Sequence, residues 1–68
     1  MDWWILFSED TISITPPGRP RRVRRVWVQT VWNDTFYVDI PYEAFSAEAV
    51  KATIEAEMEE YRKLHGVS

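Results

Sequence analysis

The stretch VWVQTVWNDTFYVDI, residues 26–40, decides the fold of this chain. It contains two runs of β-branched and aromatic residues, 26–32 and 36–40, separated by Asn33-Asp34, a pair typical of a chain reversal. The pattern therefore predicts a β-hairpin. Both runs are apolar on both faces, whereas only one segment of the chain can form a covering helix. One face of the sheet is therefore left for another molecule or for a second copy of the chain.

The register of this hairpin decides which side chains face the core. A loop of two or four residues places Val31 opposite Phe36. The far face then carries Val26, Val28, Trp32 and Tyr37. A loop of three residues places Trp32 opposite Phe36 and leaves Trp27, Val31 and Tyr37 on the far face. We prefer the first register, because Thr35 would be a poor left-handed residue in a three-residue loop.

The amino-terminal part predicts another hairpin ahead of this one. Residues 3–8 and 11–15 are rich in Ile, Trp, Phe and Thr, and Glu9-Asp10 can connect them. Phe7 would then oppose Ile12, with Trp3 on the same core-facing side. Residues 16–22 are predicted to form an extended basic loop, because the prolines within them cannot donate to a ladder.

The carboxy-terminal third predicts a helix over residues 46–65. Ser46 is a good N-cap, and Gly66 lies where a C-terminal cap is expected. With a rotation of 100° per residue, the apolar side chains of this helix fall in one stripe that should cover a face of the sheet. Ala47 and Met58 lie at the edge of the stripe. The stripe consists of Val50, Ile54, Tyr61 and Leu64. Glu57 projects from within it and requires an arginine partner or access to solvent, unless it serves as a functional acid.

These elements predict one α+β domain over residues 1–68, in which a four-stranded antiparallel sheet in ββββα order carries the helix on one face. The predicted strands cover residues 3–8, 11–15, 23–32 and 35–40. A chain of 68 residues has a marginal core, so association is an expected source of further stability.

The composition argues against several classes of protein. There is no cysteine, which excludes disulfides and cysteine-based zinc sites and favours the cytoplasm. The apolar run 3–7 is too short to cross a membrane. The sole histidine, His65, falls in the last helical turn, where a helix-dipole contact is its commonest role. We therefore expect no enzyme, no metal, no cofactor, no small-molecule substrate and no membrane partner.

The charges divide the molecule into a basic and an acidic part, although the net charge is only −3. The basic cluster consists of Arg19, Arg21, Arg22, Arg24 and Arg25 and runs directly into Trp27. It could bind phosphate or an acidic protein surface, or it could neutralise the glutamate-rich helix. The same helix, with Glu48, Glu55 and Glu59 on one side, could be a solvated surface or a mimic of nucleic-acid charge.

The aromatic residues favour binding to a protein. Four tryptophans cannot all be buried beneath one helix, and tryptophan with arginine is typical of interface hot spots. The predicted partner-binding face consists of Trp4, Leu6, Val26, Val28, Trp32 and Tyr37. We expect a homodimer that also binds another protein, as a small inhibitor or adaptor of the kind common among phage and mobile-element proteins.

A nucleic-acid binder is the alternative. In that hypothesis the phosphate contacts come from Arg21, Arg22, Arg24 and Arg25. Trp27 or Tyr37 would stack on bases. The acidic sequence pI, near 5.0, argues against strong nonspecific binding to duplexes.

Overall fold

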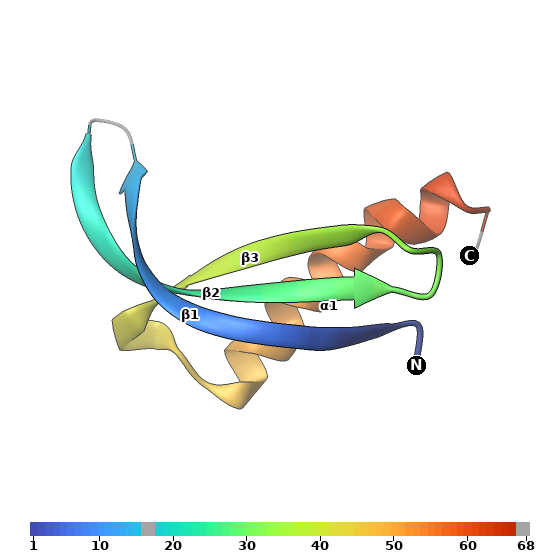
Figure 1. Cartoon of the computed structure of the whole chain (residues 1–68), viewed down its shortest axis with the longest axis horizontal. Helices are drawn as coiled ribbons and strands as arrows, with labels where there is room; N and C mark the ends of the chain where they lie inside the picture. The colour runs from blue at the N-terminus through green and yellow to red at the C-terminus, as the bar shows by residue number, and fades with distance from the viewer. Residues whose placement is uncertain (16–17, 67–68) are drawn as a thin grey trace.

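The computed structural model describes residues 1–15 and 18–66. Strands β1 (Trp3–Thr15), β2 (Arg19–Thr30) and β3 (Thr35–Pro41) form one antiparallel sheet in the order β1-β2-β3. A short 3-10 helix, η1 (Tyr42–Ala44), leads to the helix α1 (Ala47–Leu64). Figure 1 shows α1 behind one face of the sheet, while the other face is uncovered. The predicted α+β class and the carboxy-terminal helix are confirmed.

The prediction of four strands is wrong, because residues 3–8 and 11–15 belong to one continuous strand, β1. Glu9 and Asp10 do not form a turn but lie opposite Arg25 and Arg24 of β2. Opposite charges on facing residues stabilise a ladder, so these acids fit within a strand. As a consequence, Phe7 lies opposite Trp27 rather than opposite Ile12, and the first hairpin joins β1 to β2.

The predicted loop over residues 16–22 is also wrong where the structure describes it, because β2 begins at Arg19. Beyond the end of β3, residues 12–15 and 19–22 pair only with each other and form a two-stranded arm that curves away from the sheet (Figure 1). Pro20 is compatible with this arm, since β2 has a free edge there and needs no second ladder. Residues 16–17 of the predicted loop lie outside the described part of the chain.

A β-bulge at Leu6 changes the side-chain alternation along β1. Ile5 pairs with Val28, whereas Phe7 pairs with Trp27, so Leu6 is the extra residue. Before the bulge, odd-numbered residues share the helix-covered face; after it, they lie on the opposite face. The bulge therefore places Phe7 on the uncovered face of the sheet.

The second hairpin exists, but neither of the two registers considered is observed: Val28 pairs with Phe36, and Val26 pairs with Val38. The turn between the strands is set by Thr30, whose Oγ1 accepts hydrogen bonds from the backbone N–H groups of Trp32 and Asp34, each at 3.2 Å. Asn33 has a φ of 68° and so takes the left-handed conformation, which leaves Thr35 free to begin β3. Val26 and Val28 consequently face the helix.

The core lies between α1 and the strands β2 and β3. The helix contributes Val50, Ile54 and Met58, and Trp3 joins the core as predicted. The sheet contributes Val26, Val28, Val38 and Ile40. Of the predicted stripe, Tyr61 is half-buried and Leu64 is exposed. Glu57 is also exposed, in agreement with the interpretation that its side chain reaches solvent.

Both helix caps are confirmed. Ser46 is the N-cap, and its hydroxyl accepts a hydrogen bond from the N–H of Ala49. Gly66, with a φ of 73°, follows the last turn in the left-handed conformation expected of a C-terminal cap. Within residues 1–15 and 18–66, no helix is both long enough and apolar enough to cross a membrane.

Candidate protein-interaction face

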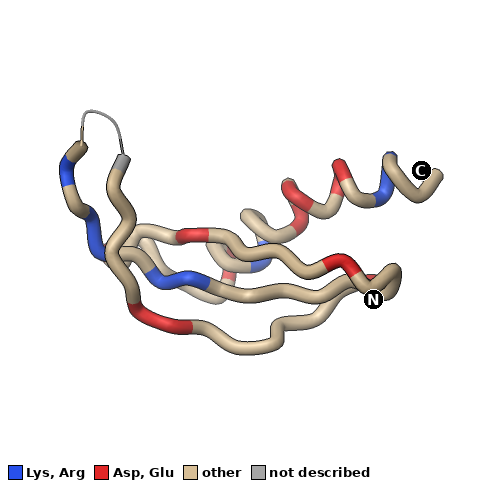
Figure 2. Tube along the Cα trace, turned by 45° about the horizontal axis from the view of Figure 1, so that its top comes forward, with Lys and Arg blue, Asp and Glu red and all other residues tan. Residues whose placement is uncertain are grey.

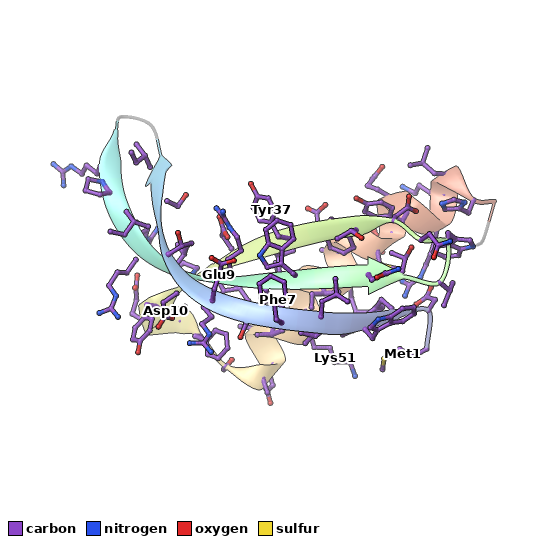
Figure 3. All side chains as sticks on the ribbon, viewed as in Figure 1. Met1, Phe7, Glu9, Asp10, Tyr37 and Lys51 are labelled. Atoms are coloured by element: carbon purple, nitrogen blue, oxygen red, sulfur yellow. The ribbon has the colours of Figure 1, made fainter. Side chains whose placement is uncertain are left out.

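Three aromatic rings lie side by side across the uncovered face of the sheet, one on each strand. Phe7 stacks on Trp27 with ring centroids 5.9 Å apart and an interplanar angle of 22°. Trp27 contacts Tyr37 at 5.0 Å with an angle of 51°. Figure 3 shows Phe7 and Tyr37 over the middle of the sheet, with Glu9 beside them. We call Phe7, Trp27 and Tyr37 the aromatic row; its outer members are 54% and 47% exposed.

Polar contacts hold the aromatic row in place. The indole N–H of Trp27 donates to Oε2 of Glu9 at 2.9 Å. Arg25 donates from Nε and Nη2 to the two oxygens of Asp39, at 2.8 and 3.0 Å, and its Cζ lies 4.1 Å from the centre of the Tyr37 ring. The hydrogen bond to Asp39 raises the pKa of the Arg25 guanidinium. These contacts orient Trp27 and Tyr37 without a partner, and such preorganisation lowers the entropy cost of binding.

The sheet divides the predicted partner-binding residues between its two sides. Trp4 and Tyr37 lie on the uncovered face, and Leu6 is exposed at the bulge. The placement of Val26 and Val28 on that face is wrong, because both are buried beneath α1. The placement of Trp32 there is also wrong.

Trp32 lies in the turn after β2, where its ring stacks on His65 at 4.6 Å with an interplanar angle of 8°. Nε2 of His65 is 2.9 Å from Oδ2 of Asp34, so the last helical turn is tied to the turn between β2 and β3. Trp32 also packs against the buried core. It therefore has a role in joining the helix end to the sheet.

Phe7 is the functional candidate that the sequence interpretation missed. The predicted hairpin turned its side chain toward the core, together with Trp3. The structure instead places it in the aromatic row, because the bulge reverses the alternation after Ile5. An apolar run that continues through successive positions, as in residues 3–7, was the available signal that both faces of this strand carry apolar side chains.

The basic cluster does not form one surface. Arg21 pairs with Glu43 at 2.9 Å, Arg24 with Asp10 at 3.0 Å, and Arg25 with Asp39 at 2.8 Å. These three acidic partners belong to β1, β3 and η1, and not to α1. The cluster is therefore balanced mainly by acids of the sheet and of η1, and not by the glutamate-rich helix.

The remaining basic side chains lie on or near the arm. The guanidinium of Arg22 lies 4.5 Å above the ring of Tyr42, and Arg19 is exposed. Figure 2 shows basic positions along the arm and acidic positions along α1. The predicted basic part is therefore reduced to the arm, since Arg24 and Arg25 lie among acids of the sheet.

A separate apolar groove runs along the outer edge of β1, on the helix side of the sheet. Its volume is about 420 Å³. The residues that line it include Met1, Trp3, Ile5, Phe45, Val50 and Lys51. Figure 3 shows Met1 and Lys51, two of the lining residues, below the outer edge of β1.

Comparisons with known proteins do not add to this geometry: the chain matches no family model, no curated protein and no solved structure. In the part of the chain that the structure describes, no three side chains of His, Cys, Asp or Glu gather closely enough to hold a metal ion. The functional argument therefore depends on the aromatic row, the groove and the arm.

Proposed function

We propose that this chain is a non-catalytic protein-interaction module that binds a partner protein through the uncovered sheet face and acts as an inhibitor or adaptor. The observation that carries the proposal is the aromatic row, whose outer rings are about half exposed while Glu9 and Arg25 contact Trp27 and Tyr37. Tryptophan, tyrosine and arginine are the residue types enriched at interface hot spots. All three occur together here, in Trp27, Tyr37 and Arg25.

The charges around the aromatic row indicate the chemistry of the partner. Glu9 and Asp39 flank the row, and Arg25 is the guanidinium between them. Two carboxylates against one guanidinium give this face a mildly negative character, which disfavours the phosphates of nucleic acid. The surface fits a protein patch that is apolar at its centre and carries lysine or arginine at its rim.

A pair of tyrosine variants tests the proposal. Tyr37 in the aromatic row and Tyr42 on η1 are 47% and 48% exposed, so Tyr37→Ala and Tyr42→Ala remove the same side chain from equally accessible positions. Tagged protein is purified from its native lysate with nuclease, and retained proteins are identified by mass spectrometry. We expect a protein that wild type and Tyr42→Ala retain, and that Tyr37→Ala binds about tenfold more weakly or worse. Equal retention by the two variants would contradict the proposal.

The arm supports nucleic-acid binding as a second candidate function. Arg19, Arg21 and Arg22 are exposed on a two-stranded ribbon, an element of the size that the DNA major groove accepts. In this case Arg21→Glu combined with Arg22→Glu should abolish binding to a short duplex and remove its salt dependence. Binding that is unchanged in the double variant, or absent from wild type at low salt, would eliminate this candidate.

A further inference from the structure

The two residues Ile5 and Val28 lie directly opposite each other in the sheet and share the helix-covered face, yet Ile5 is 47% exposed and Val28 is 0% exposed. The reason is that α1 packs over β2 and β3 and covers β1 on this side only at Trp3, so that Ile5 is left without cover. The apolar groove occupies the uncovered space. Since β1 also carries exposed apolar residues on the opposite face, its residues 4–7 are about half exposed whichever side of the sheet they face.

This first half of β1 also lies at an edge of the sheet and is weakly protected. The sheet order places β1 at one edge, and its residues 3–7 are Trp-Trp-Ile-Leu-Phe, with no charge and no proline. Edge strands are usually protected by charges, by prolines or by β-bulges, and the bulge at Leu6 is the one such device between residues 3 and 7. The other edge strand, β3, contains Asp39 and Pro41, and the second half of β1 contains Glu9 and Asp10. Residues 3–7 are therefore the segment of the sheet edge best suited to accept another strand.

We infer that β1 of one copy pairs with β1 of a second copy, antiparallel and about a two-fold axis, along residues 3–7. Two three-stranded sheets then become one continuous sheet with both helices on the same side. The two grooves meet at the axis, where Ile5, Phe45 and Val50 of each copy cover those of the other. This inference goes beyond the proposed function, since it concerns strand pairing at the edge of the sheet, where Phe7 is the one member of the aromatic row.

A second copy fits this edge better than an unrelated strand. A two-fold contact brings identical side chains together, which is unfavourable for charged segments but favourable for an uncharged apolar one. The exposed area fits a small interface. Phe7, Phe45 and Trp4 are each about half exposed, and Met1, Ile5 and Leu6 add aliphatic surface. At about half of the 150–250 Å² of an aromatic side chain, the three aromatic residues supply roughly 225–375 Å², and the aliphatic residues raise the total toward the ~600 Å² per partner at the lower end of the standard class.

Two isoleucine variants of the full chain test the inference by sedimentation equilibrium. Ile5 lies on the proposed edge, whereas Ile14 is on the same strand but in the arm and is 72% exposed. Wild type and Ile14→Lys should sediment at twice the 8.1 kDa mass of one chain at micromolar concentration, and Ile5→Lys at the mass of one chain. A monomeric wild type, or a dimer that survives Ile5→Lys, would overturn the inference.

Cysteine cross-linking provides a second readout that does not depend on a disruptive substitution. The chain has no cysteine, so Ile5→Cys and Ile14→Cys each introduce a single thiol. Near the two-fold axis the Cα atoms of the two copies come within the ~4.4–6.8 Å that a disulfide spans. Oxidation should therefore yield a covalent dimer for Ile5→Cys and not for Ile14→Cys. Equal cross-linking of the two variants would count against the proposed pairing.

The same measurements separate this inference from the proposed function. Tyr37→Ala should still form the dimer, because Tyr37 lies on β3, at the opposite edge of the sheet from the proposed pairing. A dimer that dissociates in Tyr37→Ala would mean that copies meet through their uncovered faces, which overturns the edge pairing. A dimer that persists, with no protein captured by the aromatic row, would leave the edge pairing in place and remove the proposed function.

Discussion

The indole N–H of Trp3 donates to Oε1 of Glu55 at 2.8 Å and joins the start of β1 to the middle of α1. Arg62 completes the contact, since it binds Oε2 of Glu55 at 3.0 Å and both oxygens of Asp2 at 2.8 and 2.9 Å. The backbone carbonyl of Asp2 also accepts from the N–H of Val31 at 3.0 Å. One cluster therefore fixes the amino terminus to the helix and to the turn after β2.

This cluster predicts that stability falls in acid. Hydrogen bonds from Arg62 lower the pKa of Asp2 below its ordinary value of 3.8, and those from Trp3 and Arg62 lower the pKa of Glu55 below 4.5. Since the folded-state pKa values are the lower ones, both carboxylates stabilise the fold above these ordinary values. That stabilisation is lost as the pH falls through the lowered pKa values.

Denaturant unfolding measured as a function of pH checks this prediction. The double variant Asp2→Asn with Glu55→Gln should be less stable than wild type at pH 7 and should show a flatter decline in acid. Glu59→Gln, which removes an exposed helix carboxylate, is the control and should follow wild type. A double variant with an unchanged pH profile would show that the cluster does not contribute to stability.

A second prediction concerns the fully buried Thr30, whose Oγ1 accepts from two backbone N–H groups in the turn. Thr30→Val preserves the shape of the side chain but leaves both donors without this acceptor, so it should cost about 1–3 kcal/mol of unfolding free energy. Thr30→Ser keeps the hydroxyl and should cost only about 0.8 kcal/mol for the missing methyl. Chemical denaturation distinguishes the two, and a serine variant as unstable as the valine variant would contradict this role of the hydroxyl.

A third prediction follows from the left-handed conformation of Asn33, with its φ of 68°. Asn33→Gly should leave the stability nearly unchanged, because glycine adopts this conformation without steric cost. Asn33→Ala should cost about 1 kcal/mol, or roughly 4–8 °C in Tm for a domain of this size. Thermal unfolding followed by circular dichroism measures both, and equal Tm values for the two variants would mean that the turn can adopt another conformation.

A fourth prediction compares two apolar residues of the helix. Ile54 is 0% exposed in the centre of the core, whereas Leu64 is 79% exposed at the end of α1. Ile54→Ala should therefore cost about 2–5 kcal/mol, and Leu64→Ala within about 0.5 kcal/mol. If Leu64→Ala proved as costly in urea unfolding at concentrations where the protein is monomeric, α1 would be packed differently from the arrangement in Figure 1.

The helix could be predicted from sequence because its signals are local. Ser46 and Gly66 bound it, and an apolar stripe of helical period marks its buried side. Trp3 was also correctly assigned to the core. The strands could not be delimited in the same way, because Glu9-Asp10 has the composition of a turn and becomes acceptable within a strand only through Arg24 and Arg25. That information lies far along the chain.

The candidate site was harder to predict than the fold class. Tyr37 and Trp4 were correctly placed on the uncovered face, but the registers considered put Val26 and Val28 at the wrong positions. The register depends on the Thr30 hydroxyl and on the backbone of Asn33, and neither preference is visible in a pattern of apolar residues. Pro20 contributed to the wrong prediction of a loop over residues 16–22. The rule against proline in strands holds for central strands, and not for a two-stranded arm.

The extra residue in β1, Leu6, gives this strand one position that its ladder does not use. Deletion of Leu6 would bring Ile5 and Phe7 together as neighbours, still opposite the neighbours Val28 and Trp27, so every side chain of β1 would keep its side of the sheet. Loss of a residue between Phe7 and Glu9 would instead turn the side chains on one side of the gap onto the opposite face, unless the bulge absorbed the change. The first strand should therefore tolerate a change of length at Leu6 in evolution better than elsewhere.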